Sequence, residues 1–303
     1  AEGNTLYVRG GRGNEVAYLV DGMYVNDPVM GGLATRISND AISELNFLSG
    51  TFNAEYGNAL SGVVNIVTKE GGREFAGNIE ARTSEFGIAP YKNYRENRVD
   101  ATLSGPILAD DLSFFVTGER DARSSWLPFG SDQTLSTMAK LTGRVLPEIK
   151  GILTWRYSEN EHRPYSEAWK YIPDQYRRVR EKSRQLIGTI THTVASNLFY
   201  DIRFSYFNQS YYSGIDKDTS QYISSANWTY LPVGTGGEFY QHADPQEMTD
   251  NRTKTYNLKG DVVWAINTKN EVKAGFDFRK FDLSYFNVYD PKRNAPYITN
   301  FKE

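Results

Sequence analysis

The three histidines of this sequence are side chains that could bind a metal or transfer a proton, but each is isolated from the others in the sequence. His162, His192 and His242 lack a second ligand at the close spacing that zinc sites use, so we interpret them as surface residues. Asp216 and Asp218 alternate in DKDTS as calcium ligands do, but the rest of a calcium-loop pattern is missing. The sequence therefore predicts no bound metal.

Motifs for catalysis or cofactor binding are incomplete as well. GGRGNE (10–15) contains Gly-x-Gly, yet it lacks the third glycine and the following helix that would hold a phosphate group. The chain has no cysteine, which excludes thiol nucleophiles, disulfides and Cys-rich metal sites. No Ser, His and Asp grouping stands in a hydrolase motif. We expect neither enzymatic activity nor a cofactor.

Charge and hydropathy exclude two further classes. The net charge is -3 and the pI is about 5.8, which leaves no general basic surface for nucleic acid. The mean hydropathy is -0.56, and no apolar run reaches the ~18 residues that a membrane-spanning helix needs. The absence of cysteine suits a periplasmic or surface protein. Because AEGNTLYVRGG has no signal-peptide features, we expect a signal peptide to lie upstream or to have been removed.

From residue 73 onward, apolar and polar side chains alternate with a period of two, which is typical of β-strands with one apolar face. In REFAGNIEART (73–83), for example, Phe75 and Ile79 share one face, while Glu80 and Arg82 share the other. We count about nine such strands. Their length of roughly 10 to 14 residues exceeds that of most soluble strands and suffices to cross a bilayer at a tilt.

The connections between these strands differ in length in a regular order. Short turns are expected at 104–111, 146–151, 194–197 and 265–270. Long connections are expected at 121–136, 159–183 and 213–250. Outer-membrane barrels combine tight periplasmic turns with long extracellular loops, whereas a soluble sandwich has no reason to do so. Aromatic residues near strand ends suit an interfacial girdle: Trp155, Tyr157, Tyr206, Trp264 and Phe278.

The alternation also predicts which side chains face lipid. We expect apolar residues to point outward, namely Phe75, Ile79, Leu141, Leu153, Ile202, Phe204 and Phe276. We expect ionic residues to point inward, namely Glu80, Arg82, Lys140, Arg156, Arg203 and Asp277. The reason is that a Lys or Arg facing lipid at mid-depth costs about 2 to 4 kcal/mol. The alternation shifts near Arg279, where we expect a β-bulge or the exit from the membrane.

Residues 5 to 72 have a different character. Short strand-like stretches are joined by glycine turns, and SNDAISEL (38–45) predicts a short helix capped by Ser38, Asn39 or Asp40. We expect a compact mixed α/β unit. VRGGRGNEVAYLVDGMYVNDP and AISELNFLSGTFNAEYGNALSGVVNIVTKEGG resemble the plug domain of TonB-dependent outer-membrane receptors, in particular their Oar-like branch.

The resemblance implies a mainly β fold with two parts. Residues 1–72 would form part of a small mixed α/β plug domain, and residues 73–303 the first antiparallel transmembrane strands of a β-barrel, about nine of the family's roughly 22. Arg9 in VRGG matches a plug arginine that contacts the barrel wall, whereas Ser49 in FLSG stands where many siderophore receptors have arginine. Because nine strands would leave two open edges, we expect the chain to continue past Glu303 or other chains to close the wall.

The resemblance also implies location, function and partners. We expect the chain to lie in outer-membrane lipid and to take part in plug-gated, energy-coupled uptake of a scarce extracellular ligand, driven by an inner-membrane TonB complex. The ligand could be a siderophore, a glycan or a peptide. The alternative is a surface-binding or structural display protein with a static plug. An energy-coupling box upstream would favour transport.

The loop between about 213 and 250 is the candidate region for ligand contact. Its aromatic side chains offer rigid amphipathic surfaces for sugars or peptides: Tyr222, Trp228, Tyr230, Phe239 and Tyr240. The same side chains could instead pack the loop on itself or on neighbouring loops. Sequence reasoning leaves both interpretations open.

Overall fold

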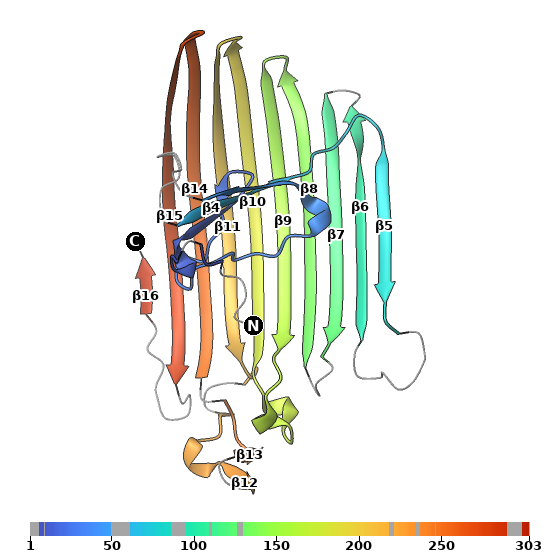
Figure 1. Ribbon diagram of the computed structural model, residues 1–303, viewed down its shortest axis with the longest axis vertical. Helices are drawn as coiled ribbons and strands as arrows, with labels where there is room; N and C mark the ends of the chain where they lie inside the picture. The colour runs from blue at the N-terminus through green and yellow to red at the C-terminus, as the bar shows by residue number, and fades with distance from the viewer. Residues whose placement is uncertain are drawn as a thin grey trace.

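Two β-sheets account for most of the chain (Figure 1). The computed structural model describes residues 6–8, 10–49, 61–85, 95–108, 111–125, 130–217, 221–233, 237–245, 247–289 and 299–302. Residues up to 72 contain a four-stranded sheet, called here the N-terminal unit, and the rest build a large antiparallel sheet. No helix among the described residues is long and apolar enough to cross a membrane.

The large sheet contains the nine long strands that the alternation predicts, plus a short tenth. In chain order these are β5 (Ala76–Thr83), β6 (Glu96–Leu108), β7 (Leu112–Ser124), β8 (Ser131–Leu146), β9 (Ile149–Arg163), β10 (Arg178–Ala195), β11 (Leu198–Gly214), β14 (Glu247–Asn267), β15 (Asn270–Tyr289) and β16 (Thr299–Lys302). Sequential strands pair as antiparallel neighbours, with β5 and β16 at the two edges. Several strands are longer than expected, and β14 reaches 21 residues.

Short and long connections alternate as predicted, so the sheet has two distinct ends. We call them the short-turn end, at the top of Figure 1, and the long-loop end, at its bottom. The long connections carry the 3-10 turns η3 (Glu167–Trp169), η4 (Pro173–Gln175) and η6 (Ser225–Asn227), and the hairpin of β12 (Thr229–Val233) and β13 (Gly237–His242). The connection expected over 121–136 is shorter, because β7 continues to Ser124 and β8 begins at Ser131.

The two faces of the large sheet have the predicted register. All seven apolar residues expected on the outward face are exposed, for example Ile202 at 45% and Phe204 at 44%. On the opposite face, Lys140 and Arg156 are only 3% and 4% exposed. The bulge expected near Arg279 is wrong, since β14 and β15 stay in register throughout that region. The alternative of a membrane exit there stays a prediction.

The N-terminal unit is a mixed sheet that lies across the inward face of the large one (Figure 1). Its strands are β1 (Val16–Val20), β2 (Met23–Tyr24), β3 (Ile42–Leu48) and β4 (Gly62–Thr68), in the order β2-β1-β4-β3 with β1 and β4 parallel. It also contains the 3-10 turns η1 (Gly13–Glu15) and η2 (Asn39–Ala41).

The helix expected over 38–45 is wrong in extent. Ser38 does accept a hydrogen bond from the backbone of Asp40, as a cap would, but only the single turn η2 follows. The chain then enters β3, because Ile42 to Leu48 pair with β4. Tertiary pairing therefore overrides the local helix signal.

An apolar cluster joins the N-terminal unit to the large sheet. Val16, Val20 and Ile66 of the small sheet pack with Phe207 of β11, which is 1% exposed. A second, smaller cluster joins Ala41 to Phe115 and Met138. Around these contacts the interface is polar.

Candidate functional site

A buried ion pair fixes the turn between β1 and β2 to the large sheet. Asp21 has φ 49, and Gly22 after it has φ 78, so the Asp-Gly pair makes the tight hairpin turn its sequence favours. The Asp21 carboxylate accepts hydrogen bonds from the Thr68 backbone N at 2.8 Å and from Thr68 Oγ1 at 2.7 Å. Lys140 Nζ lies 3.1 Å from Asp21 Oδ2 and donates to the Thr68 carbonyl at 3.1 Å. Each charge therefore has its partner.

A second polar contact involves the loop before η2. The Thr35 hydroxyl lies 2.8 Å from Ser183 Oγ and 3.3 Å from Ser158 Oγ. Arg156 donates to Thr35 Oγ1 at 3.2 Å and to Gln185 Oε1 at 2.8 Å. No carboxylate lies within ion-pair distance of Arg156 among the described residues. The guanidinium is thus held by neutral hydroxyl and amide oxygens.

Two more inward cations contact the turn region of the N-terminal unit. The Arg279 guanidinium lies 4.4 Å from the centroid of the Tyr24 ring. Arg203 packs so close to Gly22 that a Cβ at that position would lie 3.0 Å from Arg203 Nη1. Burial raises the pKa of the Tyr24 hydroxyl, and the nearby Arg279 charge opposes that shift. The inward ionic face predicted from sequence is therefore where the N-terminal unit binds.

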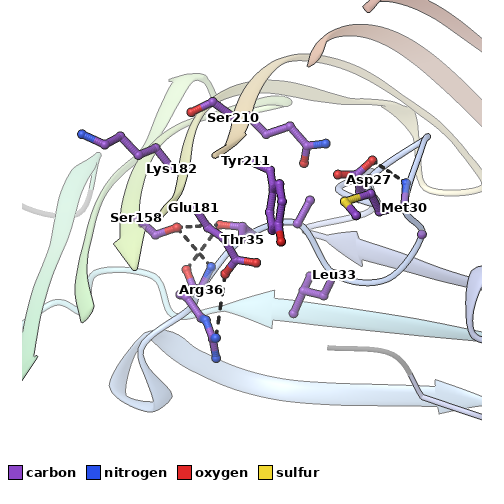
Figure 2. Close-up of a pocket in the computed structure, with 13 residues that line it drawn as sticks. Asp27, Met30, Leu33, Thr35, Arg36, Ser158, Glu181, Lys182, Ser210 and Tyr211 are labelled. Carbon is purple, nitrogen blue, oxygen red and sulfur yellow. Dashed lines mark hydrogen bonds and ion pairs between the residues drawn. The ribbon is translucent and has the colours of Figure 1, made fainter. Parts of the chain in front are cut away.

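A small cavity lies beside the Thr35 contact (Figure 2). It has a volume of about 90 Å³ and is lined by the loop from Asp27 to Arg36 and by β9 to β11. Glu181, Tyr211 and Arg36 face it, and Arg36 Nη2 lies 3.9 Å from Glu181 Oε2. Ligand pockets usually measure about 300 to 1,000 Å³, so this cavity can hold one small polar group of a larger ligand.

The aromatic residues expected to contact ligand form a packed cluster at the long-loop end. The Tyr240 ring centroid lies 4.5 Å from that of Trp169, 5.5 Å from Trp228 and 5.3 Å from Tyr230. Phe239 lies under Lys170 Nζ, 3.9 Å from the ring centroid. The loop thus packs both on itself and on the connection between β9 and β10, while Tyr230 keeps 39% of its surface exposed.

Tyr222 differs from the other loop aromatics. It is 2% exposed, and its hydroxyl accepts a hydrogen bond from the Ile215 backbone at 3.5 Å. Burial raises its pKa. In this conformation it offers no surface to a ligand. In the neighbouring connection, hydrogen bonds from Tyr165 and Lys170 lower the pKa of the Glu167 carboxyl.

The remaining sequence candidates lie apart from this site. Arg9 and Asp218 fall outside the described residues, so the predicted contact of Arg9 with the wall stays a prediction. Asp216 lies beside Arg178 and Arg180, at 3.6 Å and 3.5 Å. The described residues contain no group of three or more potential metal ligands.

Sequence reasoning missed Thr35, Asp21 and Thr68 as interface residues. One signal was available for Asp21, since an Asp-Gly pair flanked by apolar residues predicts a hairpin turn whose carboxylate is fixed in position. The hydroxyl of Thr35 carries no such signal. Its partners are distant in sequence, as Ser183 shows with a separation of 148 residues.

The long amphipathic sheet, with a mixed unit bound to its inward face, has the arrangement that the resemblance to outer-membrane receptors implies, and comparisons with known proteins agree. No protein-family model matches the chain. Over 124 residues, 36% of the chain, it is 33% identical to the TonB-dependent transporter Oar of Myxococcus xanthus. Over 131 residues, 43% of the chain, it is 30% identical to a probable TonB-dependent siderophore receptor, PirA, of Acinetobacter baumannii.

Solved structures show the same fold at low identity. The outer membrane transporter YddB from Escherichia coli superposes with a TM-score of 0.69 at 11% identity, over 93% of this chain and 42% of that chain. The pyoverdine outer membrane receptor FpvA from Pseudomonas aeruginosa gives a TM-score of 0.67 at 13% identity, over 97% of this chain and 45% of that chain.

These findings confirm the resemblance to TonB-dependent outer-membrane receptors, including Oar. The chain is an outer-membrane protein, and its relatives are transporters and receptors rather than enzymes. It spans less than half the length of these solved structures, and the matched residues make up 12% and 17% of the two sequence relatives.

Proposed function

We propose that the chain is part of a TonB-dependent transporter in which residues 1–72 belong to the plug and residues 73–303 to the barrel. The observation that carries this proposal is the polar attachment of the N-terminal unit to the inward face. Lys140 and Arg156 reach across to Asp21 and Thr35 from strands whose other face is apolar. Hydrogen bonds to charged groups such as these can be exchanged for bonds to water at a net cost of about 1.5 to 3 kcal/mol each.

This energetic property suits a plug that opens. An entirely apolar interface would lose about 25 cal/mol for each Å² exposed to water, with no compensation. A polar interface instead finds new partners when water enters. The apolar contact through Phe207 keeps the unit seated at rest, and the energy of an inner-membrane TonB complex would displace it.

The ligand is expected to arrive at the long-loop end, which we assign to the cell exterior. The aromatic cluster lies at that end, and the cavity beside Thr35 is lined by the parts of β10 and β11 that are nearest to it. Trp228, Tyr230, Phe239 and Tyr240 would offer ring surfaces to a siderophore, a glycan or a peptide. One relative is named a siderophore receptor, which makes ferric siderophores the first ligands to test.

Uptake should depend on the energy-coupling partner. Cells that carry the whole receptor should accumulate a radiolabelled ferric siderophore in a strain with a working TonB complex, and should only bind it at the surface when that complex is deleted. The reason is that the resting plug blocks the lumen. Equal accumulation in the two strains would contradict energy-coupled transport. Binding without accumulation in both would support the alternative of a surface-binding protein with a static plug.

Removing an exposed loop aromatic should weaken ligand binding. Tyr230→Ala is expected to reduce affinity roughly tenfold, or about 1.4 kcal/mol, because it removes one ring of a contact surface. Tyr256→Ala is the matched control, since Tyr256 is also 39% exposed but lies on the outward face of β14. Titration of labelled ligand on whole cells measures the affinity of each variant. Equal affinities for the two variants would remove Tyr230 from the ligand site.

A further inference from the structure

The outward face of the large sheet changes character near its long-loop end. One row across four strands is apolar or aromatic: Trp155, Leu186, Tyr206 and Tyr256 are cross-strand partners. The next outward row consists of Tyr157, Arg184, Asn208 and Lys254. The row after that consists of Glu159, Lys182, Ser210 and Arg252. Cations thus begin directly beyond a row of aromatic and apolar side chains, and the row on the other side of it, Leu153, Gly188, Phe204 and Leu258, carries no charge.

The four cations of these rows are not equally neutralised. Lys182 pairs with Glu159 at 2.8 Å, and Arg252 pairs with Asp250 at 2.9 Å. Arg184 lies 5.7 Å from the Tyr157 ring centroid, and within the described ranges neither it nor Lys254 has a carboxylate within 4.0 Å. Both are exposed. The face therefore holds two uncompensated positive charges at one depth.

These charges are placed to meet on one ligand. Asn208 of β11 is the direct cross-strand partner of both Arg184 and Lys254, so their backbones lie two strand spacings apart, or roughly 10 Å. Their long side chains can close over that gap. A groove of about 400 Å³ at this position is lined by Arg184, Asn208 and Ser210, together with Arg180, Lys182, Arg252 and the Asp250 carboxylate that pairs with Arg252. Lys254 stands beside this groove as the cross-strand partner of Asn208. An amide and a hydroxyl add hydrogen-bond donors to the flanking charges.

We propose that Arg184, Lys254, Lys182 and Arg252, with Asn208 and Ser210, form a binding site for a phosphorylated lipid headgroup. Phosphate oxygens accept charge-assisted hydrogen bonds from several cations at once, and Arg binds them in a bidentate manner. The position selects lipid over a soluble ligand. The site is on the face opposite the N-terminal unit. The aromatic rings of Tyr206 and Tyr256, 5.2 Å apart, lie in the adjacent row on its short-turn side. Tyrosines of an interfacial belt lie where headgroups meet acyl chains, so the site would lie at headgroup level.

The inference requires the membrane location of the sheet and not the transport cycle. If the long-loop end faces the exterior, as proposed above, the lipid belongs to the outer leaflet. Ordinary interfacial cations would also lie at this depth, with their charges in water. The difference is measurable, because such cations would retain no particular lipid once the protein is extracted.

The test compares two double variants of the whole receptor in bilayer nanodiscs of phosphatidylcholine with a small share of phosphatidic acid. Arg184→Gln with Lys254→Gln removes the two uncompensated charges of the site. Lys269→Gln with Lys273→Gln removes two charges from the short-turn end of the same sheet. Native mass spectrometry after release into detergent counts the phosphatidic acid retained by each protein, and mobility on unheated gels reports folding.

We expect the wild type and the Lys269/Lys273 variant to retain phosphatidic acid, and the Arg184/Lys254 variant to bind it roughly thirtyfold more weakly, since each basic residue near a membrane surface contributes about a factor of five. Equal retention in all three proteins would overturn the proposal. Displacement of the lipid by millimolar inorganic phosphate would also overturn it, because the site would then be a general anion site rather than a lipid site.

Discussion

Locking the N-terminal unit to the large sheet should abolish uptake and leave ligand binding intact. In the Thr35→Cys/Ser183→Cys variant, the new thiols replace hydroxyls whose oxygens lie 2.8 Å apart. The two side chains therefore already point at each other, as the sulfurs of a disulfide must, and the chain has no other cysteine to compete. If the unit must move for the ligand to pass, oxidation should reduce siderophore accumulation to the level of receptor-free cells. Dithiothreitol should restore it.

A matched pair of substitutions controls for the loss of the hydroxyls. Ser158 and Ser183 also lie 2.8 Å apart, but both belong to the large sheet, on β9 and β10. A disulfide in Ser158→Cys/Ser183→Cys therefore joins the sheet to itself, and uptake should persist under oxidation. Full uptake through the oxidised Thr35/Ser183 form would show that this part of the unit stays in place during transport. That result would favour the alternative of a static plug.

Removal of the buried Lys140 charge should loosen the N-terminal unit strongly. Lys140→Met leaves the Asp21 carboxylate without its cation beside a side chain that is 3% exposed, and breaking a buried pair in this way costs about 3 to 5 kcal/mol. A loss of 3 kcal/mol corresponds to a roughly hundredfold larger equilibrium constant for opening of the N-terminal unit. Hydrogen exchange of the backbone amides in β1 and β4, followed by mass spectrometry, measures this opening.

An exposed pair across the same interface supplies the control. Lys150 and Glu70 are 2.9 Å apart, yet their side chains are 45% and 37% exposed, so Lys150→Met should cost less than about 1 kcal/mol. The Lys140→Met/Asp21→Asn double variant should recover part of the loss, because the isolated buried charge is removed. Identical exchange rates for the Lys140 and Lys150 variants would show that the buried pair does not hold the unit.

The faces of the large sheet could be read from the sequence because a strand encodes them locally. Side chains alternate at every residue, and a slip of one position would place Arg203 in lipid and Ile202 in the interior. That penalty acts on each strand separately. The faces of Ile202, Phe204 and Lys140 can therefore be predicted from the alternation within their own strands, without reference to the neighbouring strands. The alternation of short and long connections is equally local. It therefore predicts that the sheet has two distinct ends.

Interactions across the interface were decided only by the tertiary structure. Thr35 and Ser183 are 148 residues apart, and no local pattern marks a hydroxyl that will meet another one at that separation. The expected helix gave way to β3 for the same reason, since pairing with β4 outweighs a weak local preference. The aromatic loop likewise depends on Trp169 from another connection. The sequence by itself determined which side of each strand is polar, because that property repeats within a few residues. Which polar groups hold the N-terminal unit depends on how distant segments meet in space, and only the folded arrangement specifies that.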